Sequence, residues 1–210
     1  MVKRALLKQQ VEHQKWLEEE GGTEGATHIE TLMQPEQQRR ISWLKEHCAG
    51  TREILDVGCN FGWILNEIDG KCGVDINRGN IEAARRQFPS RWFRVGDVTK
   101  GLDFEDQSMD IVVEADLLEH LKWFRGVEAA LEEGLRIARR KLLITLPWRN
   151  DEKCALCFKH SWVPDERRVG KILVLLMLQV NKVTTECDGT FIYIKAINKS
   201  GKGDSKSQLT

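Results

Sequence analysis

The sequence carries no net charge: its 210 residues include 32 lysines and arginines against 32 aspartates and glutamates. A chain without a basic excess offers no broad surface for following phosphates. The composition therefore argues against nucleic acid and against an anionic membrane as partners, although local charged patches stay compatible with it.

Long hydrophobic runs are also missing. The longest, ILVLLMLQV at residues 172–180, is much shorter than the roughly 20 residues that cross a bilayer, and it predicts a buried helix. The first residues lack the apolar core and the small-residue cleavage site of a signal peptide. We therefore expect a soluble, cytoplasmic protein whose six cysteines are reduced.

Apolar strands alternate with helical stretches from residue 51 onward. This alternation predicts a parallel sheet with helices on both faces. The expected strands are 53–57, 71–76, 91–97, 110–115 and 141–146, and the clearest helices between them are 79–88 and 126–140.

The two ends of the chain differ from this core. Residues 1–48 carry amphipathic helical patterns, with one helix expected at 35–48, and they predict an N-terminal helical lid or extension. The main domain is expected at 49–198, and it closes with a helix near 165–178 and two strands joined by an Asp188-Gly189 hairpin turn. The polar tail at 199–210 is expected to be disordered.

The stretch EILDVGCNFGW, residues 53–63, follows the first strand and resembles a nucleotide-binding turn with a glycine missing. A dinucleotide fingerprint requires glycine at positions 58, 60 and 63, whereas this chain has Asn60 and Trp63. Asn60 tolerates left-handed backbone geometry, so Gly58, Asn60 and Gly62 fit a different glycine spacing. Amides at the following helix suit a small carboxylate, and Asp56 suits an ammonium group beside it.

Two further acids close the next strands of the sheet. Asp75 ends the second strand, where its carboxylate can accept hydrogen bonds from both hydroxyls of a ribose. Asp97 ends the third strand, where it can accept from an adenine amino group while the amide of Val98 donates to the ring. An amino-acid end, a ribose and an adenine together describe S-adenosylmethionine.

These segments resemble the class I S-adenosylmethionine-dependent methyltransferases, most closely the small-molecule branch called methyltransferase type 11. The likeness covers residues 51–148 through ILDVGCNFG, GVDIN, the stretch from GDVT to LLEHL, and KLLITLPW. It implies a Rossmann-like, doubly wound α/β fold. That fold has a mainly parallel seven-stranded sheet, a C-terminal antiparallel hairpin and N-terminal helices.

The resemblance also implies a set of cofactor-binding residues. Glu114 ends the fourth strand, where the family layout faces the cofactor, but a solvent-facing strand end fits this position nearly as well. Cys59 is expected to act only through its backbone amide. The full expected set is Asp56, Gly58, Cys59, Asn60, Gly62, Asp75, Ile76, Asp97, Val98 and Glu114.

Two histidines are candidates for catalysis. His120, in LLEHL, could take a proton from an acceptor hydroxyl, but in the family this segment is also a structural element. His160 follows the fifth strand between Trp148 and Trp162, in a segment with a weaker likeness to the acceptor side of such enzymes. The two tryptophans could stack on a ring, or they could be ordinary pocket wall or core.

Metal binding is not expected. Cys154, Cys157 and His160 form one C-x2-C with a nearby histidine, and a structural zinc site would need a fourth ligand such as Cys187. A single pair of this kind is a weak signal, so we expect both cysteines to serve as small core residues.

The sequence therefore predicts methyl transfer to a small molecule, with a sugar or natural-product hydroxyl favoured as acceptor. In-line positioning supplies much of the rate of such a reaction, so no catalytic residue has to stand out. The Asp/Asn-Pro-Pro-Tyr/Phe signature of DNA amino-methyltransferases is absent after the fourth strand. One alternative is a non-catalytic subunit that binds the cofactor; another, disfavoured by Asn60 and Trp63, is a nicotinamide-dependent oxidoreductase. The oligomeric state is left open.

Overall fold

A computed structural model describes residues 33–122, 124–148 and 164–198. The chain forms two compact units, residues 1–43 and 44–210, and the second contains all of the strands. Helix α3 (Pro35–Cys48) begins in the first unit, at the proline where the sequence predicts its start. The expected lid at 1–48 and tail at 199–210 lie largely or wholly outside the described residues.

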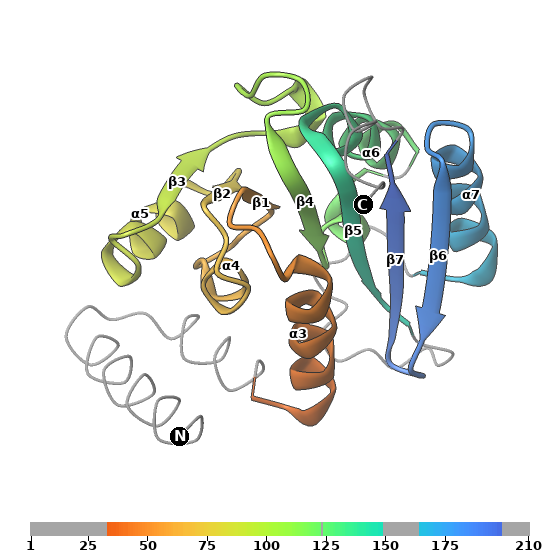
Figure 1. The fold of residues 1–210 in the computed structure, drawn as a ribbon, viewed down its shortest axis with the longest axis horizontal. Coiled ribbons are helices and arrows are strands. Elements are labelled where there is room, and N and C mark those ends of the chain that lie inside the picture. Colours follow the sequence, from red (N-terminus) through yellow and green to blue (C-terminus); the bar gives the residue numbers. More distant parts are fainter. Residues whose placement is uncertain (1–32, 123, 149–163, 199–210) are drawn as a thin grey trace, which may run out of the picture. The chain divides into compact units, whose positions relative to one another are not determined.

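A seven-stranded sheet forms the centre of this unit, in the order β3-β2-β1-β4-β5-β7-β6 (Figure 1). Strands β1 to β5 run parallel, and β7 runs antiparallel to both β5 and β6. This arrangement confirms the predicted fold class, including the C-terminal hairpin. The strands are β1 (Ile54–Val57), β2 (Cys72–Asp75), β3 (Trp92–Val95), β4 (Met109–Ala115), β5 (Ala138–Pro147), β6 (Lys182–Cys187) and β7 (Phe191–Ile197).

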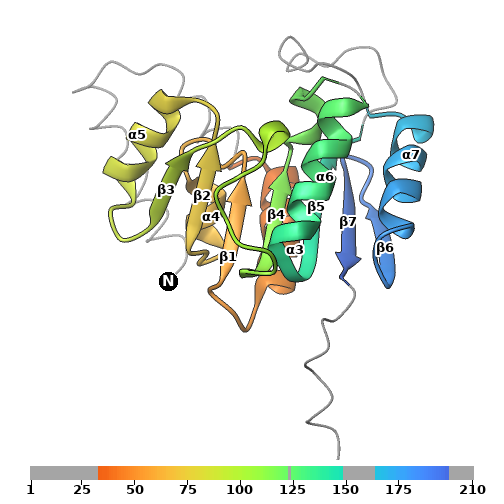
Figure 2. The same cartoon turned by 90° about the horizontal axis from the view of Figure 1, so that it is seen from above.

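Helices cover both faces of the sheet. Helices α6 (Arg125–Ile137) and α7 (Glu166–Met177) lie on one face, where they share a continuous core with β1, β2, β4, β5 and β7 (Figure 2). Helices α4 (Trp63–Glu67) and α5 (Arg78–Gln87) belong to the other face. There Trp63 meets Phe88 edge-on at a ring distance of 5.0 Å, a geometry that aromatic pairs favour.

Side-chain caps explain where two of these helices begin. The carboxamide of Asn77 accepts from the amides of Gly79 and Asn80 at the start of α5. At the start of α7 the carboxylate of Asp165 accepts from the amide of Arg168. Each cap satisfies backbone donors that the first helical turn leaves without an intrahelical partner.

The C-terminal end of α6 differs from the sequence prediction. The helical pattern predicts a helix to residue 140, but α6 ends at Ile137 and residues 138–140 already belong to β5. Met109 of β4 pairs with Ala138, so pairing between the first residues of β4 and β5 overrides the local helical preference. No helix in the described part of the chain has the length and apolar character needed to span a membrane.

Candidate functional site

The site follows from the strand order. Strand β1 has β2 on one side and β4 on the other, so the chain changes direction across the sheet between β1 and β4. In doubly wound sheets, ligands bind at the carboxyl ends of the strands beside such a switch point. The turns after β1, β2, β3 and β4 meet at this edge, which we call the carboxyl edge.

The turn after β1 has left-handed backbone geometry at three positions. The φ angles are 78° at Gly58, 49° at Asn60 and 80° at Gly62. Asn60 thus adopts the left-handed conformation that its residue type was expected to tolerate. At Gly62 a Cβ would come within 2.6 Å of Cζ of Phe93, so packing as well as backbone geometry requires glycine there.

The amides of this turn are engaged within the protein. Gly58 and Cys59 both donate to the carbonyl of Val74, and Gly62 donates to the carbonyl of Cys59. The amide of Asn60 donates to Oδ2 of Asp75 at 2.9 Å. These four amides therefore donate within the protein, and the expectation that amides at the start of the following helix meet a small carboxylate stays a prediction.

Asp75 connects the first two turns of the carboxyl edge. Besides the bond from Asn60 to Oδ2, its Oδ1 accepts from the amide of Asn77 at 2.8 Å. A carboxylate has about four lone-pair positions, so each oxygen keeps capacity for a further donor. The carboxylate is therefore fixed in place by two backbone donors and can still accept hydrogen bonds from a ligand.

Asp97 caps the short helix η1 (Val98–Lys100) after β3. Its Oδ1 accepts from the amide and the hydroxyl of Thr99, and Lys100 lies 2.9 Å from its Oδ2. These contacts with Lys100 and Thr99 lower the pKa of Asp97, so the group is ionised near neutral pH. The neighbouring predicted residues differ in exposure: Val98 is buried, whereas Ile76 is 67% exposed beside Asp75.

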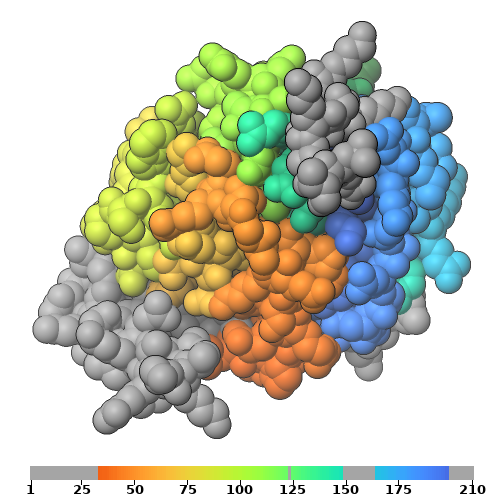
Figure 3. Space-filling model, viewed as in Figure 1, coloured from red at the N-terminus to blue at the C-terminus, as the bar shows by residue number. Residues whose placement is uncertain are grey.

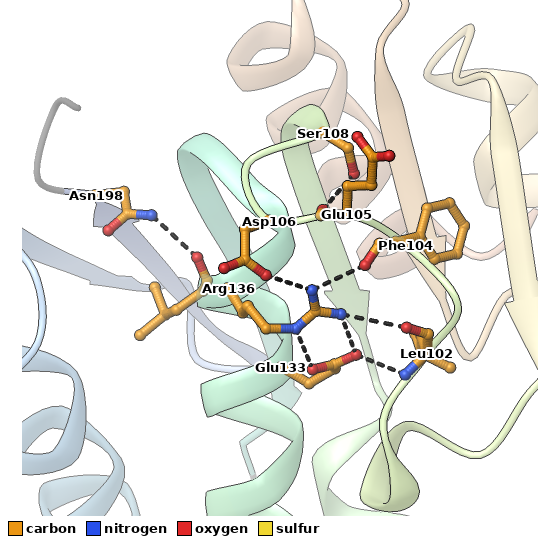
Figure 4. Close-up of polar contacts among 9 residues, drawn as sticks. Leu102, Phe104, Glu105, Asp106, Ser108, Glu133, Arg136 and Asn198 are labelled. Carbon is orange, nitrogen blue, oxygen red and sulfur yellow. Dashed lines mark hydrogen bonds and ion pairs between the residues drawn. The ribbon is translucent and has the colours of Figure 1, made fainter. Parts of the chain in front are cut away.

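The loop after η1 is held to α6 by an ion-paired network (Figure 4). Arg136 of α6 donates to Glu133 and to the backbone carbonyl of Phe104, and Glu133 accepts from the amide of Leu102. The bond from Arg136 lowers the pKa of Glu133. This network fixes the path of the chain immediately after Asp97.

Asp56 and Cys59 lie beneath the turn. The side chain of Asp56 is 1% exposed, and that of Cys59 is 5% exposed. Burial, followed by the nearby charges of Asp56 and Asp75, raises the pKa of Cys59 well above its ordinary value. Cys59 is therefore a neutral thiol that packs inside the domain, in agreement with the expectation that it is not reactive.

Glu114 lies elsewhere. Its carboxyl is fully buried, and neither oxygen accepts a hydrogen bond from any described residue. A Cβ on Gly134 of α6 would come within 2.6 Å of Oε1 of Glu114, so the carboxyl occupies the space that this glycine leaves. Burial raises its pKa to about 8. The structure places Glu114 under α6, facing neither the carboxyl edge nor solvent.

A third carboxylate, Asp116, which was not among the predicted site residues, follows β4. Asp116 has a φ of 52°, and its Oδ1 accepts from the hydroxyl of buried Thr145 at 2.8 Å. The next residue, Leu117, packs against Gly58, where a Cβ would come within 2.9 Å of its Cδ1. The available signal was the one that identified Asp75 and Asp97: an aspartate directly after an apolar strand.

Of the candidates for catalysis and metal binding, some lie in the described residues and the others do not. His120 is exposed at the end of η2 (Leu118–His120), just beyond Asp116. Trp148 is partly buried against the core. His160, Trp162, Cys154 and Cys157 lie outside the described residues. Cys187 is exposed, and the described ranges contain no cluster of three or more potential metal ligands.

Comparison with known proteins agrees with this geometry. Residues 55–143 match the family model described as a methyltransferase domain, Methyltransf_11. Among curated proteins, no significant match to the sequence was found.

Solved structures share the fold. A TehB-like SAM-dependent methyltransferase from Corynebacterium glutamicum is 20% identical over 76% of this chain and 87% of its own, with a TM-score of 0.56. The N-methyltransferase NodS from Bradyrhizobium japonicum is 14% identical over 80% and 98%, with a TM-score of 0.59. Magnesium protoporphyrin IX methyltransferase from Synechocystis, solved with bound SAM, is 16% identical over 77% of each chain, with a TM-score of 0.54.

Proposed function

Because residues 55–143 belong to the class I S-adenosylmethionine-dependent methyltransferases, we propose that this enzyme methylates a small-molecule acceptor, with a sugar or natural-product hydroxyl favoured. The observation that carries the proposal is the set of carboxylates at the carboxyl edge. Asp75 and Asp97 both accept bonds from backbone amides of their own turns. They are thereby positioned as acceptors for a ligand that is rich in hydrogen-bond donors and carries positive charge.

The parts of the cofactor fit this donor and acceptor pattern. We assign the two ribose hydroxyls to Asp75 and the adenine amino group to Asp97, with the amide of Val98 on the ring. The exposed side chain of Ile76 offers an apolar surface for the flat adenine. Asp56 supplies negative charge beneath the turn. Glu114 is left out of the set because its carboxyl faces Gly134.

When bound, the cofactor supplies a methyl group on a sulfonium sulfur. As the acceptor atom bonds to the methyl carbon, the carbon–sulfur bond breaks and the sulfur keeps its electron pair. The protein has to hold the two reactants in line and exclude water. For a hydroxyl acceptor a base must also take the released proton. We assign that role to His120 or His160, of which His120 lies at the end of η2, after β4.

The acceptor is proposed to be small because the chain has a net charge of zero. A polymer of phosphates requires a basic surface, and binding to one weakens steeply with salt. Titration with polynucleotides across a salt series tests this choice. Tight, salt-sensitive binding together with methyl incorporation into the polymer would replace the small-molecule acceptor with a nucleic acid.

The test of the reaction is transfer of a labelled methyl group from S-adenosylmethionine into a panel of hydroxyl and amine acceptors. Transfer to a hydroxyl by the parent, with a large loss in His120→Asn or in His160→Asn at unchanged cofactor affinity, supports the proposed base. If methyl transfer persists in both variants, neither histidine is the base, and their roles are structural.

A non-catalytic cofactor-binding subunit is the second candidate. The Methyltransf_11 match covers 55–143 and leaves the acceptor side without a family assignment. Cofactor binding without transfer to any acceptor, followed by transfer once a partner protein is added, would favour this reading.

A further inference from the structure

Helix α7 carries two apolar stripes. Val169, Ile172 and Leu176 are buried against the core of the sheet. A helix that covers a sheet requires only one such stripe. The second stripe repeats at the i, i+3, i+4 and i+7 spacing of a helix–helix contact, and it consists of Gly170, Leu173, Val174 and Met177.

The second stripe faces the border of the sheet. Val174 is 57% exposed and Met177 is 61% exposed, and a Cβ on Gly170 would meet nothing within 4 Å. Helix α7 contacts both α6 and β6, and in Figure 2 α6 lies toward the centre of the sheet while β6 lies at its border. From the right-handed winding of α7, we infer that the exposed stripe is turned away from α6. Figure 3 shows the blue surface of β6 beside that of α7 along one border.

Strand β6 is the edge strand at this border. The amide of Asp188 donates to the carbonyl of Phe191 at the closed end of the β6–β7 hairpin. Because hydrogen-bonded pairs alternate in antiparallel strands, Val183 and Thr185 direct their backbone groups away from β7. In the described residues no strand pairs with that outer side, and such an edge is a template for another strand.

We propose that a second copy of this chain pairs with β6 in antiparallel register centred on Thr184, with α7 packed against α7 of the partner subunit. A two-fold axis perpendicular to the sheet requires that residues of the same face lie opposite each other. The register centred on Thr184 meets this requirement. It places Lys182 opposite Glu186 of the partner subunit, so two opposite-charge pairs form.

The helices fit the same symmetry. Helix α7 contacts β6 and shares a core with β7, so it lies over the space between these two strands. Across the dyad the two α7 helices are therefore about two strand spacings apart, roughly 10 Å. Packed helices in proteins lie about 8–10 Å apart. Gly170 leaves room for close approach, and the stripes of the two α7 helices become buried together.

The first test is the oligomeric state of the full-length protein by sedimentation velocity over a concentration series. The parent should dimerise reversibly, and Met177→Lys should weaken the dimer by about tenfold or more. Leu178→Lys is the matched control: Leu178 is 73% exposed one residue further on and points away from the border, so it should leave the dimer intact. A parent that stays monomeric at its highest soluble concentration overturns the proposal.

The second test fixes the register. In a Cys154→Ser, Cys157→Ser, Cys187→Ser background, mild oxidation of Thr184→Cys should give a disulfide-linked dimer, because residue 184 faces itself across the dyad. Thr185→Cys faces Val183 of the partner subunit and should not cross-link.

Charge exchange tests the same register independently. Lys182→Glu and Glu186→Lys should each weaken the dimer, and the double exchange should restore it. A dimer that responds equally to Met177→Lys and Leu178→Lys, or that gains no cross-link at 184, overturns the β6–α7 interface.

Discussion

Acidic side chains have different partners at the two edges of the sheet. At the amino edge, where the strands begin, they form ion pairs. Asp69 meets the guanidinium groups of Arg52 and Arg91. The bond from Arg91 is the largest cause that lowers the pKa of Asp69. Further pairs at this edge join Glu53 with Lys71, Glu67 with Lys45, and Asp110 with Arg139.

At the carboxyl edge the acids are positioned mainly by backbone amides and hydroxyls. Asp75 accepts from two amides, and Asp116 accepts from the hydroxyl of Thr145. Asp97 also meets Lys100, whose side chain is 78% exposed. Charge is therefore neutralised within the protein at the amino edge, whereas the carboxyl edge keeps acceptors for a ligand. A hollow at the amino edge is lined in part by two of these pairs, Lys45 with Glu67 and Arg52 with Asp69.

The largest predicted effect concerns two acids of β4, Glu114 and Asp110. Burial raises the pKa of Glu114 to about 8 from an ordinary value of 4.5. Between these pH values the unfolded chain loses the proton and the folded chain keeps it. The free energy of unfolding should therefore fall as pH rises from about 4.5 to 8, by on the order of 5 kcal/mol in total.

Chemical unfolding across pH checks this prediction by comparing the parent with Glu114→Gln, whose side chain cannot ionise. As pH rises through that window, the free energy of unfolding of the parent should fall relative to that of Glu114→Gln. Asp110→Asn is the opposite control. Burial raises the pKa of Asp110, but the bonds from Thr51 and Arg139 outweigh it and leave the pKa lowered. The stabilisation from the Asp110 carboxylate is present above about pH 4 and is lost in acid. If the difference in free energy of unfolding between the parent and Glu114→Gln does not change with pH, the buried acid is refuted.

The next effect compares two glycines with positive φ, one at each edge. Gly50 has a φ of 90° and open space where a Cβ would be, whereas a Cβ on Gly62 would come within 2.6 Å of Phe93. Gly50→Ala should cost only the backbone strain, about 1–2 kcal/mol. Gly62→Ala adds overpacking and should cost about 2–5 kcal/mol in all. Equal melting temperatures for the two variants would contradict the packing of this turn.

Cofactor affinity should separate the two edges directly. Asp75→Ala removes an acceptor that we assign to the ribose, and it should weaken S-adenosylmethionine binding by about 1–3 kcal/mol. Asp69→Ala removes an acid of the amino edge, so calorimetry should find its affinity close to that of the parent. If the two variants bind alike, the ribose assignment fails.

The smallest effect is expected at Lys100. Its pair with Asp97 is largely in water, where such pairs contribute about 0–1 kcal/mol. Lys100→Ala should therefore leave unfolding and cofactor affinity within about 0.5 kcal/mol of the parent. Asp97→Asn should weaken binding more, because it removes charge at the proposed adenine position. A larger loss in Lys100→Ala would assign the lysine itself to the ligand.

Strands such as β1, β4 and β7 were predictable because they are largely buried and rich in β-branched residues. The hairpin at Asp188 was predictable because a single dipeptide encodes its turn. The end of α6 was not, since residues 138–140 continue a helical pattern and only pairing with Met109 directs them into β5. Local sequence carries no trace of that non-local contact.

The candidate site divides in the same way. The left-handed geometry of Asn60 follows from its residue type and its place between two glycines. The direction of Glu114 follows from the absent side chain of Gly134, twenty residues further along the chain and on another element. The turn amides bond to Val74, on a different strand. Contacts of this kind depend on tertiary packing, which a sequence pattern does not reveal.

A crystal structure with the demethylated cofactor product bound tests the central claim most directly. The account predicts density at the carboxyl edge, with the ribose hydroxyls on Asp75, the adenine over Ile76 and its amino group at Asp97. Density at the amino-edge hollow beside Lys45 and Arg52, with the carboxyl edge empty, would contradict it.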